Sequence, residues 1–185
     1  MNAWAEREAR RIEKARTLIG PGIAGPGGVW ADIGCGDGIF TAALHTLTQP
    51  GAEIYGVDND RRALDALKRH FAESYPDAVL HPIRADFRQP PSLPPIDGVV
   101  MANSLHFVRD KQPILKQIAA LLKPGGHLIV VEYNTARGNM AVPYPLDEAG
   151  FLNLAQIIGM SETRILAKIP PSFLGEMYAG IGCLP

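Results

Sequence analysis

The chain has 185 residues, which suits one domain large enough to bury most of its apolar surface. Charged residues make up 20% of the sequence and nearly cancel, to a formal net charge of −1. No overall positive field therefore draws the protein to a phosphate backbone, which argues against a nucleic-acid substrate.

No segment predicts export or membrane insertion. Residues 1–16 are dense in charge and lack the apolar core of a signal peptide, and no apolar stretch is long enough to cross a bilayer. The two cysteines, Cys35 and Cys183, imply no disulfide framework. We therefore expect a cytoplasmic protein without membrane contacts, and the composition leaves open whether it is a monomer or a homodimer.

Helix-like and strand-like segments alternate along the first 133 residues. A helix is expected at about 4–19, and the Gly- and Pro-rich break that follows makes residues 1–27 an N-terminal helix and linker before a domain at 28–185. Near-continuous apolar strands separated by helices are typical of a parallel sheet covered on both faces, which predicts a doubly wound α/β fold. The expected strands are 29–33, 53–58, 79–84, 96–102 and 127–133, and the expected helices are 39–48, 60–74 and about 113–122.

The pattern changes after residue 133. A loop at 134–145 leads to a helix near 146–159. Two strand-like runs follow, at 162–169 and 174–181, separated by Pro170-Pro171-Ser172. Such a short connection allows antiparallel pairing but leaves no room for a helical crossover.

A glycine-rich turn, Gly34-Cys35-Gly36-Asp37-Gly38, lies between the first strand of the domain and its helix. Glycines let a backbone turn sharply and approach a ligand without a Cβ in the way, and the helix start offers unpaired N–H groups. A dinucleotide-binding enzyme has a similar turn. Its Gly-x-Gly-x-x-Gly fingerprint, however, would require glycine at position 39, where this chain has Ile39.

Asp58 closes the second strand, twenty positions after Gly38. A carboxylate at this place can accept hydrogen bonds from both hydroxyls of a ribose. The alternative is an N-cap for the helix that follows, although Asn59 and Asp60 are equally well placed for that.

Four motifs accompany the expected strands, in this order: Asp-x-Gly-x-Gly-x-Gly at 32–38, Asp58, Ala85-Asp86-Phe87, and Leu122-Lys123-Pro124-Gly125-Gly126. From about residue 28 to 133 their order and spacing resemble the class I S-adenosylmethionine-dependent methyltransferases, which have a Rossmann-like fold. The resemblance implies a mostly parallel seven-stranded sheet in the order 3-2-1-4-5-7-6 with strand 7 antiparallel. It also implies S-adenosyl-L-methionine as the cofactor and a small-molecule methyl acceptor.

The resemblance further assigns roles to single residues. The three glycines of the turn would hold the methionine and ribose portions of the cofactor, and Asp32 would lie near its ammonium group. Asp86 would accept from the adenine amino group and Phe87 would pack on the base; the alternatives are a turn-stabilising Asp86 and a core Phe87. The predicted cofactor contacts are Asp32, Gly34, Gly36, Gly38, Asp58, Asn59, Asp86, Phe87 and Asn103.

The segment Asn103-Ser104-Leu105-His106-Phe107 follows the fourth strand and, in the family, passes beside the sulfonium. It lacks the Asn/Asp-Pro-Pro-Tyr/Phe signature of enzymes that methylate amino groups of nucleic acids. His106 is the titratable ring expected near the reaction centre and the candidate catalytic base; alternatively it shapes the pocket or caps the next helix. Candidate acceptor contacts are Tyr133, Arg137 and Tyr144, of which Arg137 is alternatively a solvated charge.

Two other kinds of protein stay open. A non-catalytic S-adenosylmethionine-binding module would keep the cofactor residues, and an NAD(P)-dependent reductase would share the glycine turn and Asp58, although Ile39 speaks against it. The remaining histidines show no metal-ligand spacing, so no metal site is predicted. Direct displacement at a sulfonium needs a base only if the acceptor must lose a proton, so the sequence leaves the methylated atom undetermined.

Overall fold

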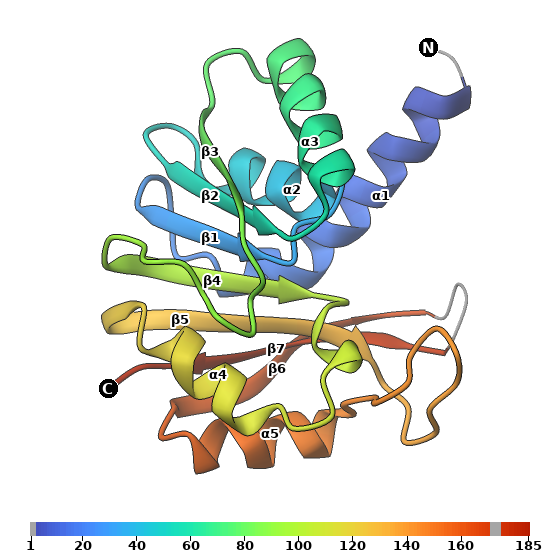
Figure 1. The fold of residues 1–185 in the computed structure, drawn as a ribbon, viewed down its shortest axis with the longest axis vertical. Helices are drawn as coiled ribbons and strands as arrows, with labels where there is room; N and C mark the ends of the chain where they lie inside the picture. Colours follow the sequence, from blue (N-terminus) through green and yellow to red (C-terminus); the bar gives the residue numbers. More distant parts are fainter. Residues whose placement is uncertain (1–2, 171–174) are drawn as a thin grey trace.

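A computed structural model describes residues 3–170 and 175–185, and its seven strands form one sheet in the order β3-β2-β1-β4-β5-β7-β6 (Figure 1). The first five strands pair in parallel, and β7 runs antiparallel to both of its neighbours. The predicted sheet order and the antiparallel last strand are thereby confirmed. The strands are β1 (Val29–Ile33), β2 (Glu53–Asp58), β3 (Val79–Arg84), β4 (Ile96–Ala102), β5 (Leu122–Tyr133), β6 (Ser161–Ile169) and β7 (Met177–Cys183).

Helices cover both faces of the sheet, with α1, α2 and α3 on one face and α4 and α5 on the other (Figure 1). The β3–β4 connection, in contrast, contains no helix. The helices are α1 (Ala3–Ile19), α2 (Ile39–Thr48), α3 (Arg61–Ser74), α4 (Gln112–Ala119) and α5 (Glu148–Ile157), with short 3₁₀ turns η1 (Gly20–Gly22) and η2 (Leu105–Phe107).

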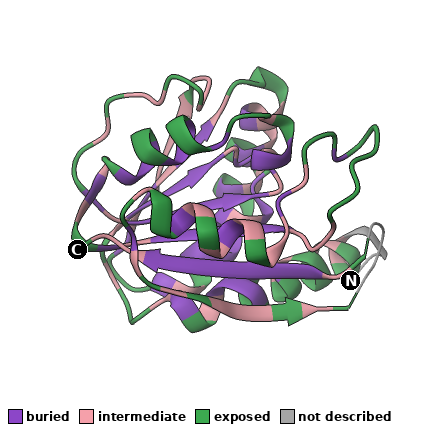
Figure 2. Ribbon diagram, turned by 90° about the horizontal axis from the view of Figure 1, so that it is seen from below, coloured by how far each residue is buried: buried purple, intermediate pink, exposed green. Residues whose placement is uncertain are grey.

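The core lies on both sides of the central strands, which Figure 2 shows as buried ribbons between partly exposed helices. Val99 of β4 packs in the cluster that includes Leu115 and Phe151, whereas its neighbour Val100 packs in the cluster that includes Leu18 and Leu44. Successive side chains of a strand point to opposite faces. Both faces are apolar here, which explains why the strands are near-continuous apolar runs in the sequence.

Helix α1 packs against α2 and β6, and its Ala15, Leu18 and Ile19 are buried. The first 27 residues therefore contribute a helix to the same core as the sheet. The expected junction at Pro171-Ser172 and the expected strand start at Leu174 lie outside the described residues. None of the helices that the structure describes is both long and apolar enough to span a membrane.

Strand β5 begins at Leu122, five residues before the predicted start at His127. Leu122 pairs with Ile96, and the register then shifts before His127 pairs with Gly98. The Pro124-Gly125-Gly126 segment thus lies within the strand, at this shift of register, rather than before it, and Gly125 has a positive φ of +79°. The sequence marked the segment only as a break before the strand, and only the long-range pairing with β4 shows that the strand runs through it.

Candidate functional site

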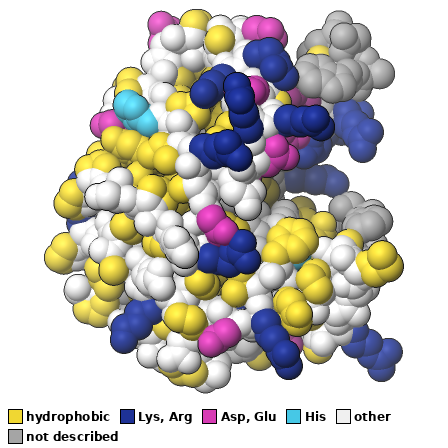
Figure 3. All heavy atoms as spheres, viewed as in Figure 1, with side chains coloured by type: hydrophobic (Ala, Val, Ile, Leu, Met, Phe, Trp, Pro, Cys, Tyr) yellow, Lys and Arg dark blue, Asp and Glu magenta, His cyan; other side chains and the backbone are white. Residues whose placement is uncertain are grey.

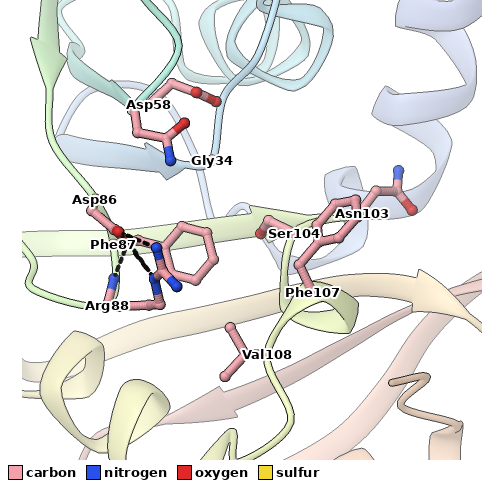
Figure 4. Close-up of a pocket in the computed structure, with 10 residues that line it drawn as sticks. Gly34, Asp58, Asp86, Phe87, Arg88, Asn103, Ser104, Phe107 and Val108 are labelled. Atoms are coloured by element: carbon pink, nitrogen blue, oxygen red, sulfur yellow. Dashed lines mark hydrogen bonds and ion pairs between the residues drawn. The ribbon is translucent and has the colours of Figure 1, made fainter. Parts of the chain in front are cut away.

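Two cavities open at the carboxyl edge of the parallel strands. The Asp58 cavity, of about 320 Å³, is lined by residues that follow β1, β2, β3 and β4 (Figure 4). The Asp32 cavity, of about 370 Å³, lies between the glycine turn and α1. Gly34 and Asn103 line both, so the two cavities meet where β1 and β4 end. Eight of the nine predicted cofactor residues line one or both cavities: Asp32, Gly34, Gly36, Asp58, Asn59, Asp86, Phe87 and Asn103.

The glycine turn brings bare backbone to both cavities. Gly34 and Gly36 have φ of +80° and +53°, in the left-handed region that favours glycine. A Cβ on Gly34 would lie 2.7 Å from the Ser104 Cβ, so this glycine lets the β1 and β4 ends approach closely. A Cβ on Gly36 would have no neighbour within 4 Å and would point into open space. Gly36 therefore leaves room for a ligand rather than for another part of the protein.

Gly38 is the predicted cofactor residue that lines neither cavity. It is the N-cap of α2, with φ of +95°, and a Cβ there would clash with the Leu67 side chain of α3. The close approach of Leu67 to the start of α2 therefore explains the third glycine.

Asp58 is held by the glycine turn. One carboxylate oxygen accepts from Gly36 N at 2.8 Å and the other from Asp60 N at 2.8 Å. Asp60, in turn, is the N-cap of α3 and accepts from Arg62 N at 2.8 Å. An ionised carboxylate has about four acceptor sites, so Asp58 retains some that face the cavity. The structure assigns the helix cap to Asp60 and frees Asp58 for a ligand.

Asp32 lies at the bottom of its cavity and is only 1% exposed. Thr41 Oγ1 donates to Oδ2 at 2.7 Å, whereas Oδ1 has no hydrogen-bond partner among the described residues. Burial raises the pKa of this carboxyl to about 7, and the nearby Asp58 adds to the increase. A buried oxygen without a partner is costly, and a cationic ligand would remove that cost.

Arg11 and Lys14 of α1 line the same cavity. Arg11 also lies 3.3 Å from the Asp37 carboxylate, which ties α1 to the glycine turn. The sequence did not single out these two cations. Fourteen residues separate the end of their helix from the turn, so only the packing of α1 on α2 shows that they reach the site.

Asp86 and Phe87 follow β3 and line the Asp58 cavity. Both Asp86 oxygens pair with Arg88, whose Nε lies 3.0 Å from each oxygen and whose Nη2 lies 2.5 Å from Oδ2 (Figure 4). The Arg88 side chain therefore holds the pKa of Asp86 below its ordinary value. Arg88 itself lines the cavity and was not predicted from the sequence, although its place two residues after Asp86 was a local signal.

Asn103, at the junction of the cavities, is strained. Its φ is +52°, which is uncommon for a residue other than glycine, and its buried Oδ1 has no partner within the described part of the chain. Strained backbone of this kind is typical of functional sites.

His106 is almost fully buried, at 3% exposed, and lines neither cavity. Its Nδ1 lies 2.7 Å from Glu132 Oε2, and its backbone N donates to Glu132 Oε1 at 3.2 Å. The imidazole is 4.3 Å from the Phe107 ring and 6.3 Å from the Tyr133 ring, measured between centroids. Phe107 lines the Asp58 cavity and Tyr133 the Asp32 cavity, so the imidazole lies behind a residue of each.

The other predicted acceptor residues differ in placement. Tyr133 lines the Asp32 cavity, whereas Arg137 and Tyr144 line neither cavity. Tyr144 N donates to the His106 carbonyl at 3.0 Å, which fastens its loop to η2. Glu132, fully buried at the end of β5, was not recognised in the sequence, because its partner His106 is 26 positions away. Across residues 3–170 and 175–185, no group of three or more His, Cys, Asp or Glu is placed to hold a metal ion.

Comparison with known families decides what kind of protein has these cavities. Residues 31–128, more than half of the chain, match the family model described as "Methyltransferase domain". The chain belongs to the class I S-adenosylmethionine-dependent methyltransferases. S-adenosylmethionine is accordingly the cofactor of this methyltransferase domain.

Two curated relatives illustrate the similarity. A ubiquinone biosynthesis O-methyltransferase from Cupriavidus pinatubonensis is 34% identical over 119 residues, which cover 61% of this chain and 45% of that protein. A carboxy-S-adenosyl-L-methionine synthase from Photobacterium profundum is 32% identical over 104 residues, or 55% of this chain and 42% of that protein. The methyltransferase chain thus spans less than half the length of these relatives.

Solved structures share the fold. Magnesium protoporphyrin IX methyltransferase from Synechocystis PCC 6803, with bound S-adenosylmethionine, aligns with a TM-score of 0.70 at 18% identity over 97% of this chain and 80% of that chain. A methyltransferase from Aquifex aeolicus aligns with a TM-score of 0.71 at 14% identity over 95% of this chain and 98% of that chain.

Proposed function

We propose that this methyltransferase transfers the methyl group of S-adenosylmethionine to a small-molecule acceptor by direct displacement at the sulfonium. The observation that carries the proposal is the chemical difference between the two cavities, which meet at Gly34 and Asn103. One cavity suits a nucleoside and the other suits a zwitterionic amino acid. S-adenosylmethionine has both kinds of end, joined at the sulfonium.

The Asp58 cavity would hold the adenosine portion. Asp58 presents carboxylate acceptor sites for the ribose hydroxyls, and Phe87 presents an aromatic ring to the base (Figure 4). The Asp86 carboxylate is already paired with Arg88, so the two side chains would face the adenine edge as a pair. Neighbouring Asn59 lines the same wall.

The Asp32 cavity would hold the methionine portion. The unpartnered Asp32 oxygen suits the ammonium group, and the cations of Arg11 and Lys14 suit the carboxylate. Gly36 offers the open space that the chain between them would occupy. An NAD molecule has no zwitterionic end, so this half of the site favours S-adenosylmethionine over a nicotinamide cofactor.

The acceptor would approach where the cavities meet, beside Asn103 and Tyr133. The bound cofactor supplies a methyl group on a good leaving group, so the protein has mainly to align the nucleophile and exclude water. The names of the O-methyltransferase relatives favour a hydroxyl on a small organic molecule. Action in the cytoplasm, without a nucleic-acid partner, stays a prediction from composition.

His106 has two roles open to it. A neutral imidazole that donates from Nδ1 to Glu132 keeps its lone pair on Nε2, as a base for a hydroxyl proton requires. The burial of the ring behind Phe107 and Tyr133 suits equally a residue that positions η2. We retain the base role as a proposal, to be separated from the positioning role by kinetics.

Calorimetry followed by turnover tests the proposal. S-adenosylhomocysteine should bind in the micromolar range, and NAD should neither bind nor compete. Methyl transfer from labelled S-adenosylmethionine should then appear with members of a panel of phenols, amines and thiols. Tight NAD binding without S-adenosylhomocysteine binding would refute the cofactor assignment, and cofactor binding without transfer to any acceptor would indicate a binding module.

A further inference from the structure

Large hydrophobic side chains are exposed mainly beside the candidate site. Five such side chains are exposed among the described residues, and three of them, Phe107, Met140 and Tyr144, belong to η2 and the 134–147 loop. Phe107 is 61% exposed, Tyr144 42%, and Met140 is fully exposed. Single exposed apolar residues are ordinary, but three on two segments joined by the hydrogen bond from Tyr144 N to the His106 carbonyl, one of them lining the Asp58 cavity, indicate a contact surface. We call these three residues the apolar rim.

The loop that carries the rim is well anchored. Val142 and Leu146 are buried, and Asn139 Oδ1 accepts from the backbone N of Ala141 at 2.8 Å and of Val142 at 2.9 Å. Tyr144 N donates to the His106 carbonyl at 3.0 Å. These bonds hold the loop in a conformation that turns Met140 to solvent.

The rim is continuous with the place of methyl transfer. Phe107 lines the Asp58 cavity, and the Tyr144 backbone N donates a hydrogen bond to the carbonyl of His106, the residue before Phe107. Figure 3 shows hydrophobic side chains gathered below the hollow, over η2 and the 134–147 loop, whereas Lys and Arg side chains gather above it, over α1 and α3. The lower side of the mouth is therefore the apolar one.

On the proposed function the two ends of the cofactor fill the two cavities, which leaves their junction for the reacting group of the acceptor. The rest of the acceptor would then lie outside the cavities, where η2 and the 134–147 loop offer exposed apolar side chains. We propose that the acceptor carries an extended apolar portion, which binds on the apolar rim of Phe107, Met140 and Tyr144. This inference rests on the proposed function and names its substrate class. An apolar chain laid over the rim would remove both its own surface and these side chains from water.

Para-n-alkylphenols, from methyl to hexyl, are suitable probes. Their dissociation constants are measured on the protein loaded with S-adenosylhomocysteine, and their kcat/KM values with S-adenosylmethionine. We expect the affinity to rise by up to about fourfold for each methylene, the factor for complete burial of one CH₂. The double variant Met140→Ser, Tyr144→Ser should flatten this dependence, with a loss of about tenfold for the longest probe.

A matched control is available in Val79 and Ile157, the two exposed hydrophobic residues away from the mouth. The double variant Val79→Ser, Ile157→Ser should retain the full dependence on chain length. Affinities that do not depend on chain length, or that both double variants flatten equally, would overturn the proposal. So would a change of oligomeric state in the Met140→Ser, Tyr144→Ser protein by sedimentation, because the rim would then be a surface between two copies of the chain.

Failure of the proposed function has a different signature. If the loaded protein binds long probes through the rim but methylates none of them, the inference stands and hydroxyl transfer is refuted. If S-adenosylhomocysteine does not bind, the cofactor assignment fails. The probe affinities of the protein alone then still test whether apolar chains bind on the rim.

Discussion

The turn after β1 and the η2 segment after β4 face each other across Gly34 and Asn103, and they are built in different ways. The turn presents mainly backbone from a few consecutive residues, exposed by two left-handed glycines, although its Gly36 N also donates to Asp58, 22 positions further along the chain. Segment η2 depends on remote residues, because Glu132 holds His106 and Tyr144 is bonded to its carbonyl.

The comparison shows how each half of the site should respond to change. Where backbone meets the ligand, conformation and space decide binding, so a single Cβ is a severe perturbation. Where side chains from distant segments meet at η2, a hydrogen bond or a charge decides, and the effect falls on the acceptor reaction rather than on the cofactor. The following experiments test whether changes at the turn affect cofactor binding and changes at η2 affect the acceptor reaction.

The largest loss of cofactor affinity is expected from Gly36→Val. The branched side chain would occupy ligand space and strain a left-handed residue, so S-adenosylhomocysteine affinity should fall at least about hundredfold by calorimetry. Gly159→Val is the matched control, since Gly159 also has a positive φ and an open Cβ position but lies at the end of α5. Both variants should fold. Normal cofactor binding by Gly36→Val would make the turn purely structural.

His106→Gln tests the half that depends on distant residues. If the acceptor is a hydroxyl and the imidazole takes its proton, kcat should fall by about 10²- to 10⁴-fold, with S-adenosylhomocysteine affinity unchanged. Glu132→Gln should reproduce part of the loss. Unchanged turnover would mean that His106 only positions η2. Weaker cofactor binding would contradict the assignment of His106 to the acceptor side of the site.

The buried carboxyl of Asp32 predicts a pH dependence. Its pKa is raised to about 7 in the folded protein, so the folded state binds this proton more tightly than the unfolded state. The free energy of unfolding, without cofactor, should therefore decrease as the pH rises from about 4 to 7, by up to about 4 kcal/mol. Denaturant titrations should show this slope in the wild type and its loss in Asp32→Asn.

Cofactor binding should depend on pH in the opposite direction. The ammonium group favours the ionised Asp32, so S-adenosylmethionine affinity should weaken by about tenfold for each pH unit below 7 and level off above it. Equal affinities at pH 5 and pH 8 would mean that Asp32 does not meet the ammonium group.

The smallest effects are expected at Asp58 and Asp60, two neighbours between which the sequence could not divide the helix-cap and ribose roles. Asp60→Ala should cost about 1 kcal/mol of unfolding free energy through the lost helix cap and leave cofactor affinity unchanged. Asp58→Ala should instead weaken S-adenosylhomocysteine binding by about 1–3 kcal/mol, the cost of unsatisfied polar partners. A reversed pattern would assign the ribose role to Asp60 instead of Asp58.

Local patterns predicted most of the fold. The apolar runs placed β1 to β4 with the bounds that the structure has, and Asp60 and Asp147 cap helices close to their expected starts. The predicted start of β5 was wrong because the first residue of the strand is defined by its pairing with Ile96, which a shift of register separates from the rest of the pairing. Gly38 shows a similar limit: its spacing indicates the need for glycine, but only packing shows that Leu67 is the reason.

The sequence by itself determined the alternating α/β architecture, the glycine turn and Asp58, and through them the methyltransferase family and its cofactor. These features depend on backbone geometry within short segments, which consecutive residues encode. Only the tertiary structure placed His106 behind Phe107 against Glu132, brought Arg11 and Lys14 over the Asp32 cavity, and gathered the apolar rim. Such contacts join residues far apart in the chain, and they depend on how helices and loops pack on the sheet, which no local pattern specifies.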